Sequence, residues 1–108
     1  MEPLKPFDNA TFFIGKFDQS ILPFLPAGSP YREFIRVKES VVCRKHIKRG
    51  EEKFIASGDR VVAVKWTASG DNGQELNKIA FYCSVACQRE HALQLQYIFV
   101  SKKRRQAS

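Results

Sequence analysis

All three cysteines and both histidines of the sequence lie in two short segments about 40 residues apart. Cys43 and His46 form a Cys-x2-His pair, while Cys83 and Cys87 form a Cys-x3-Cys pair that His91 follows. Thiolate and imidazole are the side chains that Zn²⁺ prefers, and a structural zinc takes four of them in a tetrahedron. The spacing therefore predicts one zinc held by Cys43, His46, Cys83 and Cys87, with His91 as an alternative to His46. Cysteines that merely fill space in a core are the competing interpretation.

The residues around these ligands do not indicate catalysis. Glu90 precedes His91, and Glu51 and Glu52 follow the first pair. None of them stands in a His-Glu-x-x-His or a deaminase spacing, in which a glutamate acts beside a catalytic zinc. Two histidines that a metal would claim leave none for a Ser-His-Asp arrangement. We therefore expect a protein that is not an enzyme.

The first half of the chain must position Cys43 and His46. Residues 11–17 read as a short strand. Two prolines exclude a helix or a central strand over residues 21–26, which we expect to form an extended apolar strip packed on the domain. Residues 31–42 alternate apolar and charged side chains, which predicts a half-buried strand leading into Cys43.

The second half must position Cys83 and Cys87. Residues 53–57, 60–67 and 76–82 are expected as strands, with a hairpin loop rich in glycine, Asp and Asn over 68–74. Ser84 is a good N-cap for a helix from Val85 to about Tyr97, after which β-branched and aromatic residues suggest a short strand. The predicted fold is α+β, with an antiparallel sheet of four or five strands and one C-terminal helix.

The order of knuckle, β-hairpin and helix resembles the treble-clef zinc fingers. The second segment resembles the second half of a MYND-type finger, in which Tyr-Cys-Ser-x-x-Cys-Gln-x-x-His is a common form. Its matching residues here are Tyr82, Cys83, Ser84, Cys87, Gln88 and His91. A MYND finger binds two zincs with interleaved ligands, whereas this sequence has ligands for one site. The resemblance implies a treble-clef-like domain with a single zinc.

Length and composition place the chain among small folded domains. It has 108 residues, of which 44% are hydrophobic and nine are Phe, so it is not a disordered polar segment. We divide it into a Phe/Pro-rich strip over residues 1–30, a zinc-binding domain over 31–100 and a basic tail over 101–108. A metal cross-link would help a domain of this size, which buries a smaller fraction of its surface than a large one does.

The charge balance favours an anionic partner. Lys and Arg number 18 against 11 Asp and Glu, a formal net charge of +7. Basic side chains beside a rigid zinc knuckle would contact phosphates, which predicts binding to DNA or RNA. A solvated charged surface is the competing interpretation. The candidate contacts are Arg44, Lys45, Lys48, Arg49, Lys53, Arg89, Lys102, Lys103, Arg104 and Arg105.

The alternative function is a protein-interaction finger, acting as a small subunit or adaptor of a larger assembly. It would use the Phe/Pro-rich N-terminal strip, with an exposed apolar patch that includes Phe12, Phe13, Phe24 and Leu25. The odd cysteine count, and the lack of a signal-like or membrane-spanning run, predict an intracellular protein of the nucleus or cytoplasm that is not secreted and does not contact membranes. The oligomeric state is not indicated.

Overall fold

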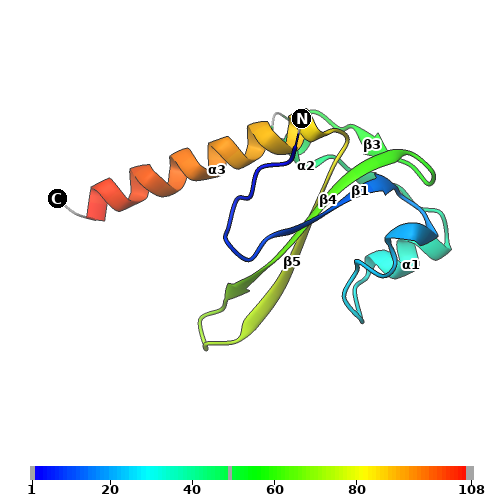
Figure 1. Cartoon of the computed structure of the whole chain (residues 1–108), viewed down its shortest axis with the longest axis horizontal. Coiled ribbons are helices and arrows are strands. Elements are labelled where there is room, and N and C mark those ends of the chain that lie inside the picture. Colours follow the sequence, from blue (N-terminus) through cyan, green and yellow to red (C-terminus); the bar gives the residue numbers. More distant parts are fainter. Residues whose placement is uncertain (1, 49, 107–108) are drawn as a thin grey trace.

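The computed structural model describes residues 2–48 and 50–106, with side chains over 2–47 and 50–95. It is a small α+β fold with antiparallel sheets and one main helix (Figure 1). In chain order its elements are β1 (Thr11–Lys16), η1 (Gln19–Ile21), α1 (Tyr31–Arg36), β2 (Val41–Val42), α2 (Arg44–Lys48), β3 (Phe54–Ile55), β4 (Arg60–Ser69), β5 (Glu75–Tyr82) and α3 (Val85–Gln106).

The main sheet has the strand order β1-β4-β5, with both neighbouring pairs antiparallel. Its central strand β4 is buried on both faces over Val61–Val64, so this stretch forms the middle of the core. The loop predicted over residues 68–74 is shorter in the structure, where residues 70–74 join β4 to β5. Gly73 takes a positive φ of 75° there, which favours glycine. The strands predicted for this half of the chain are confirmed.

A second, smaller sheet pairs β2 with β3, so the single sheet expected from the sequence is wrong. The short helix α2 lies between its two strands, and the backbone N–H of Cys43 donates to the carbonyl of Lys53 at 2.8 Å. This closes the chain between them into a knuckle that carries Cys43 and His46. The five strands of the described chain therefore form two sheets.

The strand predicted over residues 31–42 is wrong, because most of that stretch forms α1. Tyr31 and Phe34 meet edge to face with ring centroids 5.4 Å apart, as side chains three positions apart on a helix do. Ile35 is buried, and Lys38, with a φ of 58°, stops the helix before β2. The alternation that predicts a strand consists of only three apolar positions. These are too few to outweigh the helix, which places the apolar side chains of this stretch on one face.

The Phe/Pro-rich strip is folded rather than extended. Ile21 and Leu25 are buried in the core, and the Leu25 N–H donates to the Ile21 carbonyl at 3.3 Å in a helical turn. Phe13 and Phe24 pack against each other with centroids 5.9 Å apart. The exposed patch expected from these residues is therefore absent at Leu25, because this small domain uses the strip to complete its core.

The helix predicted from Val85 is confirmed, and it is longer than expected. α3 continues to Gln106, so the short strand expected after Tyr97 is wrong for the described residues. Figure 1 shows its C-terminal part projecting away from the sheets. No helix in residues 2–48 or 50–106 combines the length and apolar character that crossing a membrane requires.

Candidate metal centre

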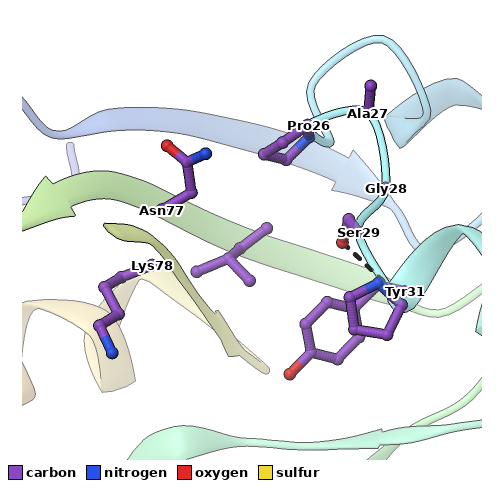
Figure 2. Close-up of a pocket in the computed structure, with 9 residues that line it drawn as sticks. Pro26, Ala27, Gly28, Ser29, Tyr31, Asn77 and Lys78 are labelled. Carbon is purple, nitrogen blue, oxygen red and sulfur yellow. Dashed lines mark hydrogen bonds between the residues drawn. The ribbon is translucent and has the colours of Figure 1, made fainter. Parts of the chain in front are cut away.

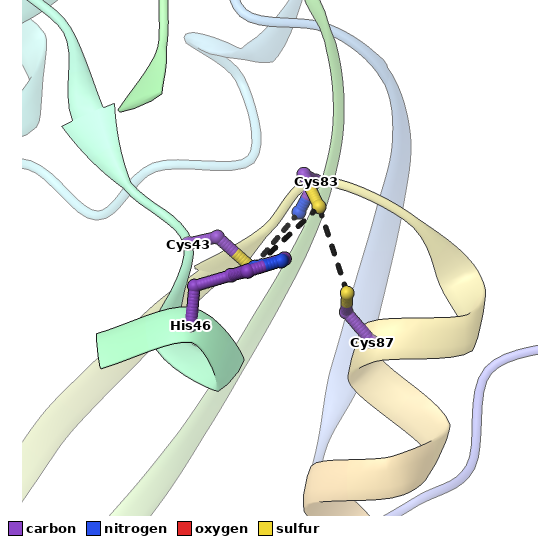
Figure 3. A group of neighbouring side chains, drawn as sticks. All are labelled: Cys43, His46, Cys83 and Cys87. Atoms are coloured by element: carbon purple, nitrogen blue, oxygen red, sulfur yellow. Dashed lines mark hydrogen bonds between the residues drawn. The ribbon is translucent and has the colours of Figure 1, made fainter. Parts of the chain in front are cut away.

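Four predicted ligands from three parts of the fold converge on one point (Figure 3). Cys43 follows β2 and His46 lies in α2, while Cys83 follows β5 and Cys87 lies in the first turn of α3. Their sulfur and ring nitrogen atoms all lie within 4.8 Å of one another. The cluster could therefore hold one metal ion, as the spacing predicts.

The separations suit a tetrahedral ion. A Zn–S bond of about 2.3 Å and a Zn–N bond of about 2.0–2.1 Å place two sulfurs about 3.8 Å apart and a sulfur and a nitrogen about 3.6 Å apart. The Sγ atoms of Cys83 and Cys87 are 3.5 Å apart, and the Cys83 Sγ lies 3.9 Å from the His46 Nδ1. An ion at the centre would need shifts of only a few tenths of an ångström on these two edges.

Backbone hydrogen bonds hold the ligands in place. The Cys83 N–H donates to the Cys43 sulfur at 3.4 Å, which joins the knuckle to the end of β5. Ser84 caps α3 as predicted, because its Oγ accepts from the Cys87 N–H at 3.2 Å. The Glu51 N–H donates to the His46 carbonyl at 2.9 Å, which fixes the end of α2.

Without a cation, the thiols of Cys83 and Cys43 differ in how readily they ionise. Burial raises the pKa of Cys83 to about 12, helped by the neighbouring Cys87 and Cys43 sulfurs. Burial also opposes ionisation of Cys43, but hydrogen bonds from the His46 side chain and from nearby backbone N–H groups outweigh it and lower its pKa to about 7. A bound divalent cation would supply the positive charge that stabilises the Cys83 thiolate.

His91, the alternative ligand, lies outside this cluster of four. It is buried, and its Nδ1 lies 2.6 Å from the hydroxyl of Tyr82. Burial raises the pKa of Tyr82 to about 12, so this hydroxyl keeps its proton at neutral pH. The geometry therefore favours His46 as the fourth ligand.

Gln88, next to Cys87, has a role that the sequence analysis missed. Its side chain is buried, with 1% of the residue exposed. Its carboxamide accepts from the Leu4 N–H at 2.8 Å and donates to the Leu4 carbonyl at 2.6 Å. Arg89 donates to the Glu2 carbonyl at 2.7 Å. These contacts span more than 80 residues, so no local pattern could have revealed them.

The candidate phosphate contacts do not form one exposed surface among the described side chains. Arg44 and Lys53 are exposed. Lys45 differs from the expectation, because its side chain is 5% exposed and its ammonium lies 3.5 Å from the Glu90 carboxylate. Arg89 is half-buried, with its guanidinium on the Glu2 carbonyl. The side chains of Lys48, Arg49, Lys102, Lys103, Arg104 and Arg105 lie outside the described residues.

Comparisons of the chain with protein-family models, with curated proteins and with solved structures give no match. The resemblance to treble-clef and MYND-type fingers therefore depends on the motif around Cys83 and on the order of the elements.

Proposed function

We propose that Cys43, His46, Cys83 and Cys87 bind one structural Zn²⁺. The observation that carries the proposal is the convergence of these four donor atoms from the knuckle, the end of β5 and the first turn of α3. Three thiolates and one imidazole are a donor set typical of structural zinc. The order of the elements along the chain, which is the knuckle, then the hairpin β4–β5, then helix α3, supports a treble-clef-like arrangement around that ion.

Four protein ligands complete the tetrahedron around a zinc. A catalytic zinc needs an open position for a water or a substrate, and these four ligands would leave none. Glu90 lies near these ligands in α3, and its carboxylate pairs with the Lys45 ammonium at 3.5 Å. We therefore propose a binding module and not an enzyme.

The binding role that the geometry supports best is protein interaction. Ten basic residues are candidates for phosphate contact, and among those whose side chains the structure describes, Arg44 and Lys53 are exposed. Apolar side chains on the knuckle are exposed as well, at Ile47 and Phe54. A rigid zinc knuckle that displays apolar side chains suits a protein surface better than a phosphate backbone.

Nucleic-acid binding is the second candidate. It is supported by the formal charge of +7 and by the exposed Arg44 and Lys53 beside the metal ligands. Phosphate contacts of this kind weaken steeply with salt, because counterions are released on binding.

Three measurements test these proposals. Elemental analysis of the purified chain should give one zinc per molecule, and a metal-free chain that folds normally would refute the zinc site. Selection from a random peptide library displayed on phage, with the zinc-loaded chain as target, should enrich peptides that bind one per chain. Titration with a dodecamer of deoxythymidine should give little binding. A salt-sensitive titration that Arg44→Glu and Lys53→Glu abolish, with no enriched peptide, would favour nucleic acid instead.

A further inference from the structure

The outer edge of β5 has no strand partner, and its residues 75–78 are exposed, whereas Ala80 and Phe81 are buried. β5 lies at the end of the strand order, so only β4 pairs with it. Within residues 2–48 and 50–106, no hydrogen bond reaches this outer edge between Glu75 and Phe81. An exposed strand edge of this kind offers a row of N–H and carbonyl groups to another strand.

Two cavities adjoin this edge. The first, of about 400 Å³, lies between Asn77, Lys78 and Ile79 on β5 and the loop from Pro26 to Tyr31 (Figure 2). The second, of about 310 Å³, is lined by Ile79, Ala80 and Phe81 on β5 and by residues of α1, β2 and α2.

The cavities meet the strand edge-on and form one groove. Successive side chains of a strand point to opposite faces, so a cavity over one face would touch alternate residues. Here each cavity touches three consecutive residues of β5. Asn77 and Lys78 point to opposite sides of the strand in Figure 2. Both cavities share Tyr31 and Ile79, so they adjoin along the edge and are treated as one groove.

The groove carries positive charge at both ends. Lys78 lines the first cavity and Arg44 lines the second, and no described lining residue of either is acidic. Between these cations the walls are aromatic and aliphatic, with Tyr31, Phe34 and Ile79 among them. Two like charges oppose pairing of this edge with the same edge of a second copy, and they attract a chain that carries carboxylates.

We propose that this groove binds an extended peptide with alternating apolar and acidic residues, which adds as a fourth strand beside β5. Backbone hydrogen bonds to the open edge supply affinity, apolar side chains fill the two cavities, and acidic side chains pair with Lys78 and Arg44. This inference rests on the proposed protein-interaction function and names its surface. The metal cluster bears on it directly, since Arg44 directly follows the ligand Cys43.

The test uses a fluorescein-labelled heptapeptide of alternating glutamate and valine and the zinc-loaded full chain, with fluorescence polarisation as readout. The double variant Arg44→Glu with Lys78→Glu should weaken binding at least tenfold. Its matched control is Lys16→Glu with Arg60→Glu, two exposed cations paired across β1 and β4 that line neither cavity. Both double variants change the net charge equally, so the control should keep nearly full affinity. Elemental analysis confirms that each retains its zinc.

A second readout locates the peptide. Amide resonances of residues 75–81 should shift when it binds, and alternate amides there should become protected from hydrogen exchange. Equal weakening by the two double variants, or shifts confined to other elements, would overturn the groove.

The proposed function would survive that result if display-selected peptides bind elsewhere, and would fail if no peptide is selected. The groove would be assigned to nucleic acid if the deoxythymidine dodecamer displaced the heptapeptide and if Arg44→Glu with Lys78→Glu weakened binding of the dodecamer. A dimer in light scattering that the same double variant dissociates would assign it to a second copy.

Discussion

The backbone N–H of Cys83 donates to the sulfur of Cys43 at 3.4 Å, although 40 residues separate them in the chain. This contact brings the knuckle against the end of the main hairpin. A metal ion at that point would join the knuckle, the end of β5 and the first turn of α3. The stability of the domain should therefore depend on the four ligands.

Replacing Cys83 or Cys87 by Ser should leave the domain unfolded or aggregating, because a hydroxyl is a far weaker zinc ligand than a thiolate. We expect a loss of at least about 3 kcal/mol in the free energy of unfolding, since binding of structural zinc is coupled to folding. For a chain of this size, that lowers Tm by roughly 10–20 °C. Circular dichroism during heating measures the change, with the exposed Ser69→Ala as control. A Cys83→Ser chain that melts like the parent would rule out a structural metal there.

The fourth ligand can be identified by exchanging histidines. His46→Cys should keep one zinc per chain, because a fourth thiolate suits the same tetrahedron, whereas His46→Ala should lose affinity for zinc. His91→Gln should keep the normal zinc content, because His91 lies outside the cluster and against Tyr82. Elemental analysis after dialysis against a weak chelator measures the zinc content. Loss of zinc from His91→Gln with normal content in His46→Ala would show that His91 is the ligand.

Zinc affinity should fall as the pH falls, and more steeply below pH 7. Binding displaces the proton of Cys83, whose pKa is raised to about 12, throughout the neutral range. Cys43, with a pKa lowered to about 7, is already ionised above pH 7 and adds a second displaced proton below it. These two thiols alone predict a loss of roughly tenfold per pH unit above pH 7 and roughly a hundredfold below. Competition with a chromophoric chelator measures the slope, and an affinity independent of pH between 6 and 8 would contradict the thiolate ligands.

Gln88→Ala should destabilise the domain by roughly 1–3 kcal/mol, because it leaves both backbone groups of Leu4 without the partners they have in the structure. Gln88→Glu is the sharper variant, since it keeps an acceptor for the Leu4 N–H but loses the donor to its carbonyl. Denaturant unfolding measures stability, and hydrogen exchange at the Leu4 amide reports the local contact. The exposed Gln74→Ala should change stability by less than about 0.5 kcal/mol. An unchanged exchange rate at Leu4 in Gln88→Ala would show that the contact does not persist in solution.

The features that could be predicted from sequence are those with strong local signals. The cluster of Cys43, His46, Cys83 and Cys87 follows from residue types and spacing. The hairpin follows from a loop rich in glycine, Asp and Asn between β-branched runs, and the start of α3 follows from Ser84. Features that depend on distant neighbours could not be predicted. Lys45 reads as a surface cation, and its burial becomes intelligible only beside Glu90 on another helix.

The missed elements show where local patterns mislead. α1 was predicted as a strand because three apolar residues alternate, whereas the pairing of Tyr31 with Phe34 needs the helix. The end of α3 was predicted as a strand from a four-residue aromatic and β-branched run. No Gly or Pro interrupts the chain there, and an established helix gains one hydrogen bond for each residue it adds.

The closeness of Cys83 and Cys87 also makes the site sensitive to oxidation. Their sulfurs are 3.5 Å apart and half-buried, so in the metal-free chain an oxidant such as peroxide could remove both thiol hydrogens and join the two sulfurs as a disulfide. The disulfide would withdraw two of the four donors and prevent zinc from returning until a reductant restored the thiols. The bound ion would thus protect the thiols from oxidation as well as stabilising the fold.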